Sequence, residues 1–144
     1  MKVITKNKKA HHEYFIKETY EAGIVLKGTE IKSIRAGKCN INEAYITLKN
    51  DELFIVSMHI SKYKESSIFN HAEKRDRKLL MHKREILRLK KAQEQDGYTL
   101  IPLKLYFKSA LVKVEVAIAQ GKKTYDKRKT LKERDLKRRL KEVY

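Results

Sequence analysis

The stretch Tyr98–Gln120, YTLIPLKLYFKSALVKVEVAIAQ, decides the fold of this chain. Apolar residues recur at every second position in two runs, which is the period of a β-strand with one buried face. The small pair Ser109-Ala110 separates the runs and marks the turn of a hairpin. The predicted inward faces are Ile101, Leu103, Leu105 and Phe107 on the first strand, and Val112, Val114, Val116 and Ile118 on the second. Pro102 is predicted to point away from the core and to mark an edge or a bulge, because proline has no N–H for the ladder.

The N-terminal third of the chain predicts a long strand and a short helix. Tyr14–Leu26 alternates apolar and polar residues, as a half-buried strand does. The helix is predicted over Glu30–Arg35, with Thr29 as its N-cap and Gly37 just beyond its end.

A second hairpin and a long helix are predicted in the middle of the chain. The hairpin turns at Asn50-Asp51, a favoured pair for tight turns. Its predicted inward residues are Ala44, Ile46 and Leu48 before the turn, and Phe54, Val56, Met58 and Ile60 after it. Lys74–Gln95 is predicted to be the helix, because pairs of large aliphatic residues recur seven residues apart and Gly97 follows. These pairs are Leu79-Leu80 and Ile86-Leu87.

Together these elements predict a mainly β domain of five or six antiparallel strands with a short and a long flanking helix. A small antiparallel OB-like β-barrel is the favoured architecture, because such barrels present a basic face to oligonucleotides. Residues 1–120 are assigned to this barrel domain, and residues 121–144 to a basic C-terminal tail.

The charge of the chain points to a polyanionic partner. Net charge is +17, from 35 Lys and Arg against 18 Asp and Glu. The tail, GKKTYDKRKTLKERDLKRRLKEVY, has too few apolar residues to fold alone. Leu136, Leu140 and Val143 recur at helical spacing, so the tail is predicted to be disordered when free and helical when bound. Nucleic acid is the leading partner, and an anionic membrane surface is the weaker alternative.

The sequence offers little for catalysis, metal binding or membrane insertion. No apolar run approaches the roughly 18 residues of a transmembrane helix, and no signal peptide is evident. Cys39 is the only cysteine, which excludes an internal disulfide and fits a reducing cytoplasm. The histidines show no paired spacing, and metal-site and phosphate-loop motifs are absent. We therefore expect no catalytic residue, no metal and no cofactor; a metal-independent ribonuclease that uses His12 is the enzymatic alternative.

Five stretches taken together resemble one known family in order along nearly the whole chain. The family is the SsrA-binding protein family, also called small protein B. The stretches are NKKAHHEYFIKETYEAGIVLKGTEIKSIRAGK (Asn7–Lys38), SMHISKY (Ser57–Tyr63), RKLLMHKREI (Arg77–Ile86), YTLIPLKLYFK (Tyr98–Lys108) and QGKKTYDKRKTLKERD (Gln120–Asp135).

This resemblance implies an RNA-binding adaptor in the bacterial cytoplasm rather than an enzyme. The expected role is to bind the tRNA-like domain of transfer-messenger RNA and to deliver the alanyl-charged RNA, with elongation factor Tu, to stalled ribosomes. Trans-translation then rescues the ribosome and tags the nascent chain for proteolysis. The protein is expected to act as a monomer. A general ribosome-associated RNA-binding OB protein, or an RNA chaperone, is the alternative.

The resemblance also implies two sets of functional residues. The expected RNA-binding positions are Asn7, His12, Glu21, Arg35, Leu80, His82 and Lys113. The positions expected in the decoding centre and the vacant mRNA channel are Gly121, Lys122, Lys123, Tyr125, Asp126, Lys127 and Arg128. Glu21 cannot pair with phosphate, but its carboxylate can accept from a base edge or hold a neighbouring side chain in place. Tyr125 stands where some relatives carry histidine, so stacking on a base is the role that carries over.

Overall fold

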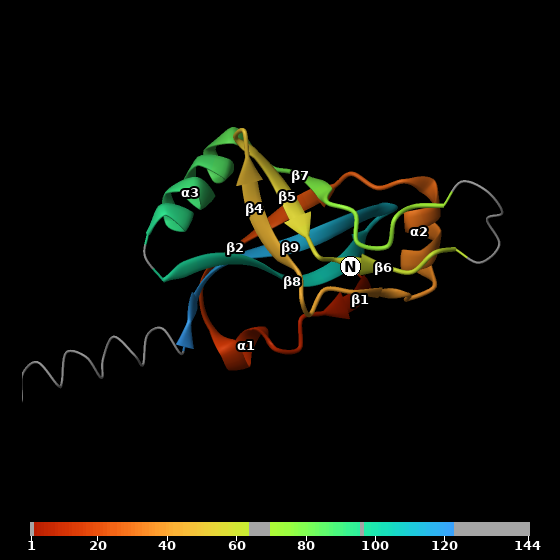
Figure 1. Cartoon of the computed structure of the whole chain (residues 1–144), viewed down its shortest axis with the longest axis horizontal. Helices are drawn as coiled ribbons and strands as arrows, with labels where there is room; N and C mark the ends of the chain where they lie inside the picture. The colour runs from red at the N-terminus through yellow and green to blue at the C-terminus, as the bar shows by residue number, and fades with distance from the viewer. Residues whose placement is uncertain (1, 64–69, 96, 123–144) are drawn as a thin grey trace, which may run out of the picture.

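The computed structural model describes residues 2–63, 70–95 and 97–122. Within these residues the order of elements is β1 (Lys2–Lys6), α1 (Ala10–Glu13), β2 (Tyr14–Ile24), α2 (Gly28–Arg35), β3 (Cys39–Asn40), β4 (Tyr45–Lys49), β5 (Glu52–Val56), β6 (His59–Ile60), β7 (Arg77–Leu80), α3 (Lys83–Glu94), β8 (Tyr98–Lys108) and β9 (Leu111–Gly121). In Figure 1, α3 and α2 lie at opposite ends of the strands, and α1 lies beneath them.

The main sheet closes on itself. Its strand order is β1-β8-β4-β5-β7-β2-β9, and β9 also pairs with β8, so the strands from β8 round to β9 form a ring. All of these pairings are antiparallel. β1 adds to β8 outside the ring, and β3 and β6 form a separate small sheet. The predicted small antiparallel barrel is therefore confirmed.

The β8–β9 hairpin follows the predicted pattern on one strand only. Val112, Val114, Val116 and Ile118 all face the main core, as predicted. On β8 the register shifts between Pro102 and Lys104, which confirms the predicted bulge. Pro102 is buried, however, so its predicted outward orientation is wrong. The bulge also splits the predicted inward face, because Leu105 lies in the main core whereas Ile101 and Leu103 lie in a second cluster.

The β4–β5 hairpin has the predicted turn but a different register after it. Asn50 and Asp51 both have positive φ, 51° and 62°, as a tight hairpin turn requires. Leu53 and Ile55 are the buried residues of β5, so the predicted burial of Phe54 and Val56 is wrong. Ser57 has φ 62° and interrupts the strand, which resets the alternation. After this break Met58 and Ile60 are buried, as predicted.

The predicted long helix is in fact a strand followed by a shorter helix. Arg77–Leu80 forms β7, and α3 begins only at Lys83. Leu79 is buried and pairs with Leu53 of β5 and Ile24 of β2, so it completes the ring of strands. Of the two residue pairs spaced seven apart, Leu79-Leu80 lies in β7 and Ile86-Leu87 lies in α3. Their combined spacing resembles the pattern of one long amphipathic helix.

The other predicted elements are largely confirmed, and three short elements were missed. The long strand is β2, and Gly37 ends α2 with φ 73°. Helix α2 begins earlier than predicted, and the carboxylate of Glu30 caps it by accepting from the Lys27 backbone N–H at 2.8 Å. Thr29 is therefore not the N-cap. β1, α1 and β3 were not predicted from the sequence.

Two apolar clusters lie on the two sides of the β8–β9 hairpin. The main core fills the inside of the ring. The second cluster lies on the outside, where Ala10 of α1 packs on Ala117 and Ala119 of β9. Helix α1 thus covers one part of the outer surface of the hairpin and leaves the rest of that surface accessible.

Candidate nucleic-acid interface

A row of paired residues crosses the accessible outer surface. Leu80 of β7 pairs with Gly23 of β2, Gly23 with Lys113 of β9, and Lys113 with Tyr106 of β8. Directly opposed residues in antiparallel strands project from the same face, about 5 Å apart. Leu80 is 53% exposed although it is a large aliphatic residue. Two of the expected RNA-binding residues, Leu80 and Lys113, therefore lie close together despite being far apart in the sequence.

Glu21 lies in the adjacent row of the same surface. It pairs with Glu115 across β9 and lies two residues before Gly23 on β2. Its carboxylate accepts from the Tyr106 hydroxyl at 2.7 Å and from the Lys108 ammonium at 3.3 Å. The hydrogen bond from Tyr106 is the main reason that the pKa of Glu21 lies below its ordinary value. Glu21 is therefore ionised at neutral pH and holds the buried Tyr106 in a fixed position beneath the surface.

The cations of this surface differ in how far they are already neutralised. Lys104 pairs with Glu115 at 3.6 Å and lies 5.5 Å from the centre of the Tyr106 ring. Lys108 contacts Glu21. Lys113 is in no ion pair among the described residues. The ammonium of Lys113 is thus the one on this surface with most capacity left for a phosphate.

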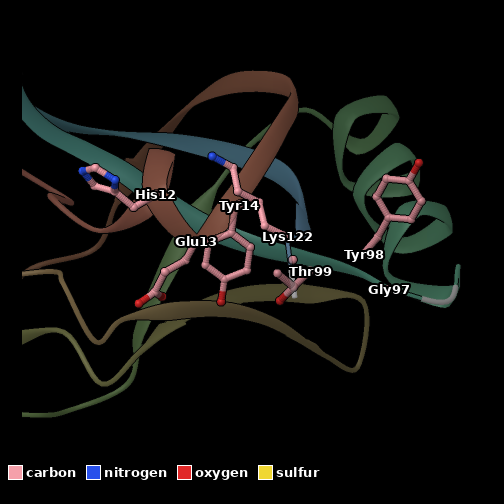
Figure 2. A pocket seen from close by; sticks show the side chains of 8 residues that line it. His12, Glu13, Tyr14, Gly97, Tyr98, Thr99 and Lys122 are labelled. Carbon is pink, nitrogen blue, oxygen red and sulfur yellow. The ribbon is translucent and has the colours of Figure 1, made fainter. Parts of the chain in front are cut away.

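A second group of expected residues lines a pocket of about 540 Å³ beside α1. It brings together His12 and the two described residues of the tail set, Gly121 and Lys122. The other lining residues are Glu13, Tyr14, Gly97, Tyr98 and Thr99. In Figure 2, His12, Tyr14 and Lys122 lie together, whereas Tyr98 stands apart beside α3. No pattern in the sequence predicts that an expected RNA-binding residue and the start of the tail line the same pocket.

The remaining expected residues lie elsewhere. The amide of Asn7 is 8% exposed; it donates to the Pro102 carbonyl at 3.1 Å and accepts from the Lys9 backbone N–H at 3.3 Å. Arg35, at the end of α2, lines a hollow of about 440 Å³ with Lys2 of β1. His82 is exposed two residues after Leu80, where it precedes the first turn of α3. Lys123, Tyr125, Asp126, Lys127 and Arg128 lie outside the described residues.

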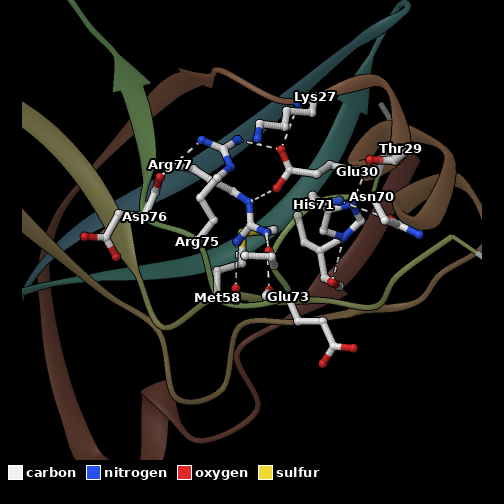
Figure 3. A network of polar contacts seen from close by, with 12 residues as sticks. Lys27, Thr29, Glu30, Met58, Asn70, His71, Glu73, Arg75, Asp76 and Arg77 are labelled. Atoms are coloured by element: carbon white, nitrogen blue, oxygen red, sulfur yellow. Dashed lines mark hydrogen bonds and ion pairs between the residues drawn. The ribbon is translucent and has the colours of Figure 1, made fainter. Parts of the chain in front are cut away.

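A buried polar network was missed by sequence reasoning (Figure 3). Arg77 and Glu30 are both fully buried and form an ion pair. Arg77 also donates to the Met58 carbonyl at 2.7 Å, and Glu30 also accepts from Arg75. Burial by itself raises the pKa of Glu30, but the hydrogen bonds from Arg75, Lys27 and Arg77 outweigh it and leave that pKa lowered. Arg75 and Arg77 fall within the predicted helix Lys74–Gln95, but Arg77 belongs to β7 and Arg75 precedes that strand, so the helix prediction is wrong for both.

A second buried group extends this network to the segment around residue 70. His71 is 1% exposed, and its Nε2 donates to the Ile60 carbonyl at 2.9 Å. Its Nδ1 lies 2.8 Å from the Thr29 hydroxyl, which explains why Thr29 does not cap α2. Asn70 bonds both the N–H and the carbonyl of Tyr63, at 3.3 and 2.9 Å. These contacts tie the residues on either side of 64–69 to each other and to α2.

Other kinds of site find little support in the described part of the chain. No group of three or more His, Cys, Asp or Glu side chains there could hold a metal ion. None of its helices is long and apolar enough to cross a membrane. Burial raises the pKa of the Cys39 thiol to about 11, so this thiol is protonated at neutral pH.

Comparison with known proteins identifies the family. A family model described as "SmpB protein" matches residues 4–144. The chain belongs to the SmpB protein family. An SsrA-binding protein from Acholeplasma laidlawii is 60% identical over 138 residues, which covers 96% of this chain and 93% of that protein. One from Geobacillus kaustophilus is 51% identical over 143 residues, covering 99% and 92%.

A solved SmpB structure is also similar to this chain. It is described as "tmRNA-SmpB: a journey to the center of the bacterial ribosome". The two chains superpose with a TM-score of 0.69 at 45% sequence identity, and the match covers 82% of this chain and 83% of the other. The resemblance to the SsrA-binding protein family is therefore confirmed in both sequence and fold.

Proposed function

We propose that this chain is an RNA-binding adaptor that binds the tRNA-like domain of transfer-messenger RNA and brings it to stalled ribosomes for trans-translation. The observation that carries the proposal is the SmpB family match across residues 4–144, which includes both the barrel and the tail. The curated relatives are SsrA-binding proteins, and the similar structure is described with tmRNA and the bacterial ribosome. The protein acts by binding and not by catalysis.

The surface around Leu80, Glu21 and Lys113 is the proposed contact for the tRNA-like domain. Lys113 contacts a backbone phosphate, and the exposed Leu80 packs against a ribose or a base. Glu21 holds Tyr106 through one carboxylate oxygen and contacts Lys108 through the other, and the remaining lone pairs of these oxygens accept from a base edge. His82 borders the same surface, and Arg35 and His12 extend the contact to the two ends of the barrel. Asn7 supports the contact indirectly, because its side chain anchors the residues that lead into α1.

The tail is proposed to engage the ribosome, separately from the barrel. Residues 1–120 form the RNA-binding domain, and residues 121–144 enter the decoding centre and the vacant mRNA channel as a basic helix. The residues that act there are Gly121, Lys122, Lys123, Tyr125, Asp126, Lys127 and Arg128. A basic helix fits the channel only when mRNA is absent, so the tail distinguishes stalled from translating ribosomes. The adaptor works as a monomer in the cytoplasm, alongside elongation factor Tu and the alanyl-charged RNA.

A competition assay tests the RNA specificity of the barrel. Labelled tRNA-like domain is bound to the full chain at physiological salt and challenged with unlabelled tRNA-like domain or with an unrelated RNA hairpin of equal length. The proposal predicts that the hairpin competes at least 100-fold less well. Equal competition by both RNAs would instead indicate a general RNA-binding OB protein, whose affinity is set by charge alone.

A further inference from the structure

Lys122, the first residue after β9, is held by two contacts to the N-terminal part of the chain. Its ammonium donates to the carbonyl of His11 at 2.7 Å and lies 5.2 Å from the centre of the Phe15 ring. A carbonyl in the last turn of a helix lacks a partner within that helix and attracts a cation. The aromatic face attracts the same cation through its quadrupole. The side chain of Lys122 therefore already has two partners in the free protein.

The two partners of Lys122 lie on elements that belong to the barrel or pack against it. Ala10 of α1 is 1% exposed and packs against Ala117 and Ala119 of β9. The Asn7 amide ties the entry to α1 to the bulge of β8 at Pro102. Phe15 lies within β2, next to Tyr14, which pairs with Gly121. The carbonyl of His11 and the ring of Phe15 thus have fixed positions relative to the last residues of β9.

Gly121 and Lys122 are both held in place at the end of β9. Gly121 is the last residue paired with β2, and Lys122 is the next residue along the chain. Without the two contacts of Lys122, rotation about the backbone after Gly121 would let the following residues point in many directions. A chain that leaves in one direction searches a smaller volume, so its effective concentration at a site in that direction is higher.

We propose that Lys122 is a positioning residue, which aims the tail by binding the His11 carbonyl and the Phe15 ring rather than by contacting RNA. The proposal rests on the proposed function, because it assigns the tail a target on the ribosome. For Lys122 alone, it replaces the direct ribosome contact proposed above with a positioning role, and the other residues of the tail set keep their proposed contacts with the ribosome. It also gives a role to Phe15, a 39% exposed aromatic residue outside the expected RNA-binding set.

A double-mutant cycle between Phe15 and Lys122 separates aiming from direct contact with RNA. Phe15→Leu keeps an apolar side chain but removes the aromatic face, and Lys122→Met keeps the stem but removes the charge. Both single variants and the double variant are assayed for peptide tagging on stalled ribosomes with charged transfer-messenger RNA and elongation factor Tu. Lys122→Arg is the matched control, because its guanidinium can still donate to the His11 carbonyl and stack on Phe15.

The expected result is that each single variant slows tagging about three- to tenfold, the scale of one lost contact to a cation. The double variant should be no slower than the slower single variant, because the two residues act through one contact. Affinity for the free tRNA-like domain should stay within about twofold of wild type, and Lys122→Arg should tag at the wild-type rate. Backbone amide order parameters of Gly121 and Lys122 should fall in Phe15→Leu while the melting temperature stays unchanged.

Two outcomes would overturn the proposal. One is normal tagging by Phe15→Leu with slow tagging by Lys122→Met, which would make Lys122 a direct phosphate contact. The other is a double variant whose tagging rate falls by the product of the two single-variant factors, because the effects of residues with independent roles multiply. Failure of the wild-type chain to tag, or to bind the tRNA-like domain, would refute the proposed function instead, so the two failures are distinguishable.

Discussion

Glu30→Gln tests the buried network most sharply, because it removes one charge and almost no volume. The carboxylate of Glu30 is fully buried and accepts from the guanidinium groups of Arg75 and Arg77 and from the Lys27 backbone N–H. Glutamine offers one acceptor oxygen in place of two and points an NH₂ group at donors. It also leaves the fully buried Arg77 without a counter-charge. Removing one partner of a buried ion pair costs about 3–5 kcal/mol.

Urea unfolding followed by circular dichroism measures this loss directly. A decrease of about 3–5 kcal/mol is a large share of the roughly 5–15 kcal/mol that stabilises an ordinary domain. Glu52→Gln is the matched control, since it makes the same change in the exposed ion pair between Glu52 and Lys78. That control should leave the unfolding midpoint unchanged, because exposed pairs contribute little. A free energy of unfolding for Glu30→Gln within about 1 kcal/mol of wild type would refute the reasoning.

Four further predictions concern Glu30, the proposed RNA-binding surface and the tail. The pKa of Glu30 is lowered in the folded state, so the stability that its ionised carboxylate contributes is present above 4.5, its pKa in the unfolded chain, and is lost as pH falls below that value. The free energy of unfolding, measured at decreasing pH, should show this loss in wild type but not in Glu30→Gln. Tyr106→Phe removes the main cause of the low pKa of Glu21, so a carboxyl NMR titration should show that pKa rising toward its ordinary value. Lys113→Ala should lower affinity for the tRNA-like domain and reduce the slope of log affinity against log salt by about 1. Truncation after Gln120 should keep binding to transfer-messenger RNA but abolish tagging, and a truncated chain that tags normally would contradict the proposed division of labour.

The fold was predictable wherever strands keep a regular alternation over many residues. β9 does so, and its inward residues follow from the sequence alone. β2 does so only after a register shift between Ile16 and Glu18, because Tyr14 and Ile16 before the shift pack against the outer cluster. β5 does not, because the positive φ of Ser57 resets the alternation, and a serine gives no clear signal of that conformation. β7 was missed because a strand of four residues leads almost directly into α3, and the combined apolar spacing resembles a longer helix.

The candidate site was less predictable than the fold, because it depends on which strands become neighbours. Leu80, Gly23 and Lys113 are aligned only after β7, β2 and β9 have paired, and no local pattern encodes that pairing. The buried pair of Glu30 and Arg77 left a weak signal. Arg77 shares the inward face of β7 with Leu79, and an arginine on the same strand face as a buried leucine calls for a buried acidic partner.

The most direct test of the account is to identify the RNA that the protein selects in cells. The full chain is tagged at its N-terminus, purified from bacterial lysate at moderate salt, and the bound RNA is sequenced. The account predicts one dominant RNA with a tRNA-like end and an internal reading frame, and its loss when Lys113 and Leu80 are both replaced by alanine. A broad mixture of ribosomal and messenger RNA that those substitutions leave unchanged would contradict the claim that this barrel recognises transfer-messenger RNA.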